Sequence, residues 1–271
     1  IYGLRFKGVY QYTYEYLINM KERNNWSGED LRNYINNEFL PSGKTAPIAI
    51  DNEGKVLMSS TGEPVRQVYN FKDGSSTYKF QGGDAIYEDI NNDGQINSLD
   101  IVYLGNSNPK VSGGFGFNFF WGSNWSLKTS FSYRAGVKVV NSAKMGLEQM
   151  FNAYNQSSAV NWRWRKNGDV TNIPRAMFDT GYNFLGSDRY VEDASFIRMS
   201  YIQLVYNFNK KLLKALGMRR LQLSISGQNL FCWSKYSGTD PEHSAGAWGI
   251  AYDNSQTPRS KSVTMNINVG F

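Results

Sequence analysis

The strongest constraint on the fold of this chain is a strict alternation of apolar and polar residues along several segments. In Val263–Phe271 the odd positions hold Val, Met, Ile, Val and Phe, whereas the even positions hold Thr, Asn, Asn and Gly. Successive side chains of a β-strand point to opposite faces, so this pattern is typical of a strand with one apolar and one polar face. We therefore expect a chain built mainly from two-faced strands.

Other segments repeat the alternation. The further predicted strands are Leu4–Tyr16, Phe115–Trp121, Trp125–Tyr133, Phe196–Phe208 and Leu221–Phe231. The second and third of these form a predicted hairpin around Gly122-Ser123-Asn124, and the fourth changes phase near Tyr201. Several run for about 9 to 14 residues, whereas globular strands most often have about 5–6 and a transmembrane β-strand needs about 9–11. Their lengths therefore favour a membrane barrel.

The links between the predicted strands alternate in length. Residues 122–124 and 209–220 are short links, whereas 135–195 and 232–261 are long, polar and rich in Trp, Asn and Gly. Outer-membrane barrels have short turns on one side of the membrane and longer extracellular loops on the other. We predict an all-β fold, a transmembrane antiparallel β-barrel with long extracellular loops. The same alternation also occurs in soluble β-sandwiches, so a soluble calcium-dependent glycan-binding sandwich stays an alternative.

Composition narrows the class of protein further. The mean hydropathy is −0.50, and no apolar run approaches the roughly 18 residues of a membrane helix, which excludes a helical membrane protein. A 15% aromatic content argues against disorder. The single Cys excludes a disulfide framework and a cysteine zinc site. The net charge of +6 is spread along the chain, so we expect no nucleic-acid partner.

One segment, 89–100, has the spacing D-x-[DN]-x-[DN]-G of a calcium-binding loop. The predicted ligands are the side chains of Asp89, Asn91 and Asp93, the backbone carbonyl of Gln95, and Asp100. Asp100 stands where such loops usually carry Glu and reaches less far, so ligation there is weaker. We expect a structural divalent cation, calcium rather than magnesium. The alternative is an Asx-rich turn without an ion.

Two other groups are candidates for contacts or catalysis. The candidate contact residues for a substrate or partner are Trp162, Arg163, Trp164 and Arg165. Their rings suit stacking on a sugar or beside a peptide, and their guanidiniums suit bidentate recognition. The alternative is loop packing or an interface with a partner protein. His243 lies near Asp240 and Glu242 in the sequence, and a hydrolase that uses these three residues is a further hypothesis. No Ser or Cys nucleophile motif is near them. We therefore expect no enzyme activity.

Several motifs occur together along the chain. They are GEPVRQVY at 62–69, the run from Gly83-Asp84 through the 89–100 loop to Gly105 and Pro109, YVEDASFIR at 190–198, NLF at 229–231, KYSG at 235–238 and DPE at 240–242. Together they resemble the SusC/RagA family, TonB-linked outer-membrane proteins of Bacteroidetes, except that Arg66 stands where the family has Gly. The end of the chain at Val269 and Phe271 resembles the terminal signal that the barrel-assembly machinery reads.

The resemblance implies a 22-stranded barrel with an N-terminal plug, of which residues 1–271 would be the C-terminal portion without the plug. In that reading 19–80 is a large loop insertion, while 135–195 and 232–261 are long extracellular loops. The implied function is import of oligosaccharides or oligopeptides across the outer membrane. TonB would energise it through the missing N-terminal part.

The partners that the resemblance implies are a SusD-like surface lipoprotein as a lid and outer-membrane lipid around the barrel. It also allows a dimer of transporter–lipoprotein pairs. A TonB-dependent siderophore receptor and a passive porin are the alternative transporters.

Overall fold

The computed structural model describes residues 1–11, 14–39, 47–51, 53, 55–71, 77–243 and 249–271. The chain divides into two compact units, and each combines segments that are distant in sequence. The first unit consists of Ile1–Leu104 and Ser142–Val191. The second consists of Gly105–Asn141 and Glu192–Phe271.

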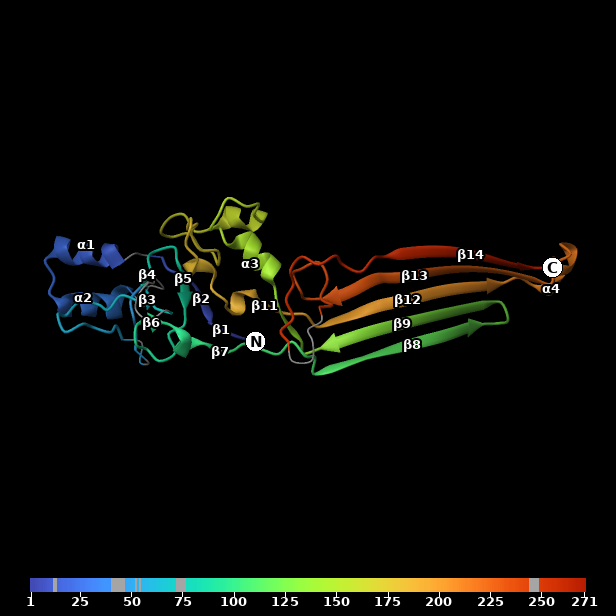
Figure 1. Ribbon diagram of the computed structural model, residues 1–271, viewed down its shortest axis with the longest axis horizontal. Helices are drawn as coiled ribbons and strands as arrows, with labels where there is room; N and C mark the ends of the chain where they lie inside the picture. Colours follow the sequence, from blue (N-terminus) through green and yellow to red (C-terminus); the bar gives the residue numbers. More distant parts are fainter. Residues whose placement is uncertain (12–13, 40–46, 52, 54, 72–76, 244–248) are drawn as a thin grey trace. The chain divides into compact units, whose positions relative to one another are not determined.

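The second unit contains a five-stranded antiparallel sheet with the strand order β14-β13-β12-β9-β8 (Figure 1). Its strands are β8 (Val111–Trp121), β9 (Trp125–Ala135), β12 (Phe196–Asn207), β13 (Arg220–Ser234) and β14 (Ser262–Gly270). They coincide with the long alternating segments of the sequence. The pairing also shifts register between Met199 and Tyr201, which confirms the predicted change of phase.

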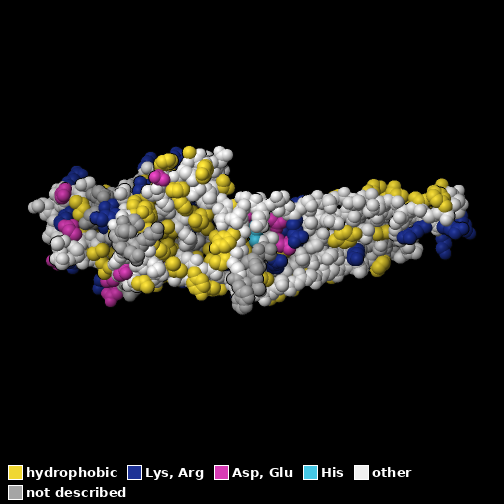
Figure 2. Space-filling model, viewed as in Figure 1, with side chains coloured by type: hydrophobic (Ala, Val, Ile, Leu, Met, Phe, Trp, Pro, Cys, Tyr) yellow, Lys and Arg dark blue, Asp and Glu magenta, His cyan; other side chains and the backbone are white. Residues whose placement is uncertain are grey.

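The strand register gives this sheet one apolar and one polar face. One row of paired residues crosses all five strands on the apolar face, namely Phe119, Leu127, Leu204, Ile225 and Met265. The adjacent row crosses the polar face and consists of Asn118, Lys128, Gln203, Ser226 and Thr264. Four members of the apolar row are exposed by 37% to 60%, and hydrophobic side chains at the surface are visible along the strands in Figure 2. Such a two-faced sheet suits lipid on one side and water on the other.

Shorter elements complete the second unit. β10 (Lys138–Val140) pairs with β11 (Val191–Asp193), and α4 (Lys210–Ala215) occupies the link that the sequence predicted as a short turn. The side chain of Asn209 caps α4 by accepting a hydrogen bond from the Leu212 N–H at 2.9 Å. A small apolar cluster in this unit contains Val137, Val139, Ala194, Tyr236 and Ala251.

The first unit is a mixture of short strands and helices. Its strands are β1 (Tyr2–Gly3), β2 (Phe6–Val9), β3 (Val68–Tyr69), β4 (Tyr78–Lys79), β5 (Ala85–Tyr87), β6 (Gln95–Ile96) and β7 (Val102–Tyr103). Its α-helices are α1 (Tyr14–Asn24), α2 (Gly28–Tyr34) and α3 (Ser142–Glu148), and a π-helix spans Ile35–Phe39. Short 3-10 helices span Ser98–Asp100, Ser158–Trp162, Tyr182–Phe184 and Asp188–Tyr190. No helix among the described residues is both long and apolar enough to cross a membrane.

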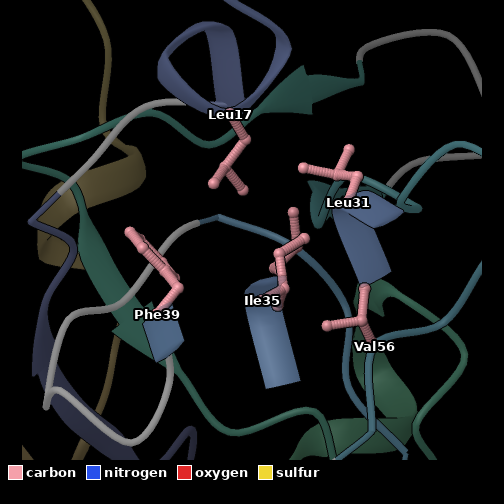
Figure 3. Packing of buried hydrophobic residues seen from close by; sticks show 6 residues of the cluster. Leu17, Leu31, Ile35, Phe39 and Val56 are labelled. Atoms are coloured by element: carbon pink, nitrogen blue, oxygen red, sulfur yellow. The ribbon is translucent and has the colours of Figure 1, made fainter. Parts of the chain in front are cut away.

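Two hydrophobic clusters hold the first unit together. One contains Leu17 from α1, Leu31 from α2, Ile35 and Phe39 from the π-helix, and Val56 (Figure 3). The other is rich in aromatic residues and has Tyr10, Phe80, Tyr87, Leu4 and Ile96 among its buried members. The packing of these two clusters stabilises the unit, although its strands are only two to four residues long.

The predicted strand Leu4–Tyr16 is wrong in its second half. β2 ends at Val9, α1 begins at Tyr14, and residues 12–13 lie outside the described part of the chain. Leu17 is fully buried against Leu31, so tertiary packing of the helix overrides the alternation of tyrosines. Within the predicted insertion 19–80, residues 28–39 form α2 and the π-helix. A capping box between Ser27 and Asp30 starts α2.

Candidate functional site

The acidic loop 89–100 folds around the turns expected for its Asp, Asn and Gly residues. Asp89 Oδ2 accepts a hydrogen bond from the Gly94 N–H, and Asp93 Oδ1 accepts one from the Gln95 N–H, both at 2.8 Å. Asn91 Nδ2 donates to Asp93 Oδ2 at 3.0 Å. Gly94 has a φ of +80°, the left-handed conformation that the sixth position of a calcium loop requires. The structure therefore brings the first three predicted ligands to one turn.

The fifth predicted ligand, Asp100, is hydrogen-bonded to the backbone of the loop. Its side chain is fully buried, and its two oxygens accept hydrogen bonds from the N–H groups of Ile90 and Asn97 at 2.7 and 2.8 Å. Burial raises the pKa of Asp89; the negative charges of Asp100 and Asp93 also raise it, whereas the Gly94 N–H lowers it.

Within the described residues no three His, Cys, Asp or Glu side chains lie close enough to hold a metal ion. An ion in this loop would therefore have to draw on the amide oxygen of Asn91 and the backbone carbonyl of Gln95 as well as on carboxylates.

The four residues of the Trp-Arg-Trp-Arg segment separate into different environments. Trp162 is 79% exposed at the end of a 3-10 helix. Trp164 packs instead on Gly83, where an added Cβ would lie 2.3 Å from the indole ring. Arg163 and Arg165 donate to the carbonyls of residues 160 and 161. Of the two tryptophans, Trp162 is thus the one whose ring presents a large surface for contact.

The sequence does not predict a buried polar network that lies beside Gly83. Asp84 is fully buried, and its Oδ1 accepts a hydrogen bond from Arg175 Nε at 2.6 Å, while the Tyr78 hydroxyl donates to Oδ2 at 2.6 Å. Burial, together with the charge of Asp84 and their hydrogen bond, raises the pKa of Tyr78 and keeps the hydroxyl protonated. Asp84 belongs to the Gly-Asp motif, but no local pattern marks Arg175 as its partner. The network ties residues 78–84 to the 142–191 segment of the same unit.

A second network joins two of the sequence motifs in the other unit. Arg198 is the last residue of YVEDASFIR, and its Nη2 lies 2.5 Å from Asp240 Oδ1, in the DPE motif. Arg198 Nε also lies 3.4 Å from Glu242 Oε2, and Arg259 Nε lies 2.8 Å from the same oxygen. Figure 2 shows acidic, basic and histidine side chains gathered at one place along the chain. We call Arg198, Asp240, Glu242 and Arg259 the loop anchor, because it fastens described residues of the segment between β13 and β14 to Arg198 on the polar face of β12.

Among the described residues, Asp240, Glu242 and His243 do not face one another as an acid–base set would. Asp240 and Glu242 face arginines, whereas His243 Nε2 lies 3.5 Å from Asp253 Oδ2, which also accepts a hydrogen bond from the Tyr236 hydroxyl at 2.5 Å. The arrangement supports a structural role for these carboxylates.

No family model matches the chain, but curated relatives and solved structures do. Three relatives from Formosa agariphila are named TonB-dependent receptors P3, P39 and P26. P3 is 25% identical over 231 residues (81% of this chain), P39 is 29% identical over 198 residues (70%), and P26 is 30% identical over 195 residues (70%).

Two solved structures show the fold. The RagAB peptide importer in a closed-closed state matches 100% of this chain and 23% of its own, with a TM-score of 0.56 and 17% identity. The RagAB peptide transporter matches 76% of this chain and 24% of its own, with a TM-score of 0.58 and 19% identity.

The resemblance to SusC/RagA-type TonB-dependent receptors is thereby confirmed over part of their length. The chain spans about a fifth of the length of the relatives that it matches, since it covers 22%, 19% and 20% of them. The five-stranded sheet is part of an outer-membrane β-barrel, so the predicted fold class and location are confirmed. The curated relatives are named receptors, and the structural matches are named importers or transporters. These names are consistent with the expectation that the chain has no enzyme activity.

The predicted assembly signal of the transporter lies on its last strand. Val269 pairs with Leu221 of β13 and is 44% exposed on the apolar face, and Phe271 beyond β14 is 80% exposed. Within the described sheet β14 pairs only with β13, so its other edge has free backbone N–H and C=O groups. A further strand of the SusC/RagA-type barrel can pair there, but recognition by the assembly machinery stays a prediction.

Proposed function

We propose that the full-length protein imports oligosaccharides or oligopeptides across the outer membrane, energised through TonB and lidded by a SusD-like surface lipoprotein. The observation that carries the proposal is the five-strand register, which puts an apolar row beside a polar row. The polar row would line an aqueous lumen, where Lys128 and Gln203 meet passing cargo. The peptide importer name of RagAB supports the oligopeptide class for this protein as well.

The loop anchor supports the same function. Loops that hold cargo or a lid need a fixed position relative to the barrel wall, and charged pairs with little solvent exposure supply it. Arg198 is only 5% exposed where it meets Asp240. In the proposed transporter the 232–261 loop lies on the extracellular side, as do 135–195 and the 19–80 insertion. A soluble β-sandwich would cover the apolar row with a second sheet, but the described part of this row is open.

Uptake by cells tests the proposal. We expect cells with the full-length transporter to accumulate labelled oligosaccharides or oligopeptides, and to lose this uptake when TonB is deleted. Uptake that continues without TonB would support a passive porin. Uptake of iron chelates alone would support a siderophore receptor.

Purification in mild detergent tests the partners. A SusD-like lipoprotein, identified by mass spectrometry in a 1:1 ratio with the transporter, is the expected result. A particle containing two such pairs would support the dimer. A bare barrel at every detergent concentration would contradict the lid.

We further propose that loop 89–100 binds a structural calcium ion through Asp89, Asn91, Asp93, the Gln95 carbonyl and Asp100. Support comes from the donor types and from the Gly94 turn, which fit a calcium loop. Calcium should raise the melting temperature of the wild-type transporter, and Asp93→Ala should abolish this increase. Without calcium the same variant should lose about 0.5–1.5 kcal/mol, because the Asp93 hydrogen bond to the Gln95 N–H is gone.

Thermal unfolding of the purified full-length transporter, with calcium or with a chelator, checks this prediction. Glu22→Ala, at an exposed acidic residue of α1, is the matched control and should keep the calcium effect. Identical melting of the wild-type protein in calcium and in chelator would contradict the site.

A further inference from the structure

The short link between β12 and β13 carries a cluster of positive charge at one end of the five-stranded sheet. Its cations are Lys210, Lys211, Lys214, Arg219 and Arg220. No Asp or Glu occurs between Asp193 and Asp240, and none occurs in β8, β9, β14 or the 122–124 link. None of the ion pairs between described residues includes any of the five cations, and the side chain of Arg220 donates to the amide oxygen of Gln222 at 3.1 Å. The described part of the protein therefore does not neutralise the charge of this link.

The link has a fixed conformation because α4 is capped at both ends. A side-chain cap starts its first turn. After its last turn the Met218 N–H donates to the Leu213 carbonyl at 2.9 Å across Gly217, which has a φ of +66°, as in a Schellman motif. The Arg219 N–H donates to the Gly270 carbonyl of β14 at 2.8 Å. The backbone of the link is thus fastened to the last strand, beside which Figure 1 shows α4.

Charged and apolar side chains lie on different faces of α4. Residues four apart lie on the same face of a helix, so Lys210 lies with Lys214, and Leu212 lies with Leu216. The two leucines are 39% and 50% exposed, and no residue of α4 is buried. Figure 2 shows basic and hydrophobic side chains gathered at the end of the sheet where Figure 1 labels α4. A helix with lysines on one face and exposed leucines on the other is typical of segments that lie at a membrane surface.

The apolar face of the sheet ends in an aromatic row directly before α4. The members of this row pair with one another across the five strands and are Trp121, Trp125, Tyr206, Leu223 and Ile267. The rings of Trp125 and Tyr206 lie 4.5 Å apart, and Phe208 follows at 4.8 Å from Tyr206. Aromatic girdles mark the membrane–water interfaces of outer-membrane barrels. Because α4 begins at Lys210, directly beyond this row, its lysines lie at the depth of the lipid headgroups.

We propose that the link 209–220 binds the phosphate headgroups of anionic phospholipids in the membrane leaflet on this side of the barrel. Its lysines and arginines pair with the phosphates, while Leu212 and Leu216 contact the acyl chains. The charge of the link favours an anionic ligand, and its continuity with the apolar face of the sheet favours a lipid over a soluble anion. The inference goes beyond the proposed import function and depends only on the outer-membrane location of the barrel.

Lipid binding to the purified full-length transporter tests the inference. The transporter in detergent micelles is titrated with dioleoylphosphatidylglycerol or with dioleoylphosphatidylcholine, and native mass spectrometry measures the lipid-bound fraction. The two lipids share their acyl chains, so a difference in affinity comes from the headgroup. We expect the phosphatidylglycerol to bind at least tenfold more tightly, and this preference to fall as the salt concentration rises.

A double variant, Lys211→Gln with Lys214→Gln, removes two of the five charges and keeps good helix formers in α4. Its affinity for phosphatidylglycerol should fall roughly tenfold or more, whereas its affinity for phosphatidylcholine should stay the same. Lys211→Arg with Lys214→Arg should keep the preference because both charges remain. The matched control, Lys79→Gln with Lys166→Gln, removes the same charge from two exposed lysines of the first unit and should bind like the wild type.

Equal affinity of the wild-type transporter for the two lipids would overturn the inference, and so would a folded double glutamine variant in α4 that keeps the preference. Displacement of the phosphatidylglycerol by an equal concentration of glycerol 1-phosphate would reveal a site for soluble anions and would overturn the assignment to lipid. None of these measurements involves TonB, so uptake by cells judges the proposed import function separately.

Discussion

Replacing Ile225 by lysine is expected to prevent stable insertion of the transporter into the outer membrane. Ile225 lies in the apolar row, paired with Leu204 on one side and Met265 on the other, and it is 46% exposed. A lysine on the lipid face of a transmembrane barrel costs about 2–4 kcal/mol near the bilayer midplane. The yield of folded, heat-resistant transporter in outer-membrane fractions measures the effect.

The adjacent residue supplies a matched control. Ser226 lies on the same strand but in the polar row, where it pairs with Gln203 and Thr264. Ser226→Lys should insert normally because its ammonium group reaches the aqueous lumen. If Ser226→Lys were as damaging as Ile225→Lys, or more so, the assignment of the apolar face to lipid would be wrong.

Removing the Arg198 side chain is expected to release the 232–261 loop and destabilise the transporter by about 3–5 kcal/mol, the usual cost of breaking a buried ion pair. Arg198→Ala leaves Asp240 without a side-chain cation, although the backbone N–H groups of Glu242 and Arg259 still donate to its carboxylate. Limited proteolysis of the loop and the thermal unfolding of the full-length protein measure the loss.

Arg259→Ala is the control for this prediction. Arg259 pairs with Glu242 at a similar distance, but its side chain is 56% exposed, so its removal should cost no more than about 1 kcal/mol. Equal effects of the two substitutions would show that the Arg198–Asp240 pair contributes nothing beyond a surface ion pair.

The loop anchor should also depend on pH. Burial raises the pKa of Asp240, but hydrogen bonds from the backbone of Glu242 and Arg259 and the charge of Arg198 outweigh it, and the pKa lies below its usual range. The stabilisation is therefore complete above the ordinary aspartate value of about 3.9, and it is lost as the pH falls through the lower folded value. Proteolysis of the loop should increase only in that acidic range.

Two ion pairs, Arg198–Asp240 and Asp84–Arg175, explain what several of the sequence motifs do in the fold. Arg198 ends one motif and Asp240 belongs to another, and they meet as one buried ion pair. Asp84 follows Gly83 in a third motif and meets Arg175. These residues hold segments together, whereas the ring of Trp162 is exposed.

Local patterns in the sequence were sufficient for the long strands and for the turn at Gly94. A strand exposes alternate residues to lipid and to water, so its pattern of side chains records both its existence and its faces. The phase change near Tyr201 and the hairpin at 122–124 follow from the same local rule. The capping box at Ser27 likewise depends only on neighbouring residues.

Only the tertiary structure decided which distant segments meet. The pairing of β9 with β12 across a long connection, the Arg198–Asp240 ion pair and the Asp84–Arg175 ion pair have no local signature. Helix α1 replaces a predicted strand because burying Leu17 against Leu31 outweighs the preference of alternating tyrosines for a strand. Such contacts depend on packing and on closing long loops, and those free energies belong to the whole fold rather than to any window of sequence.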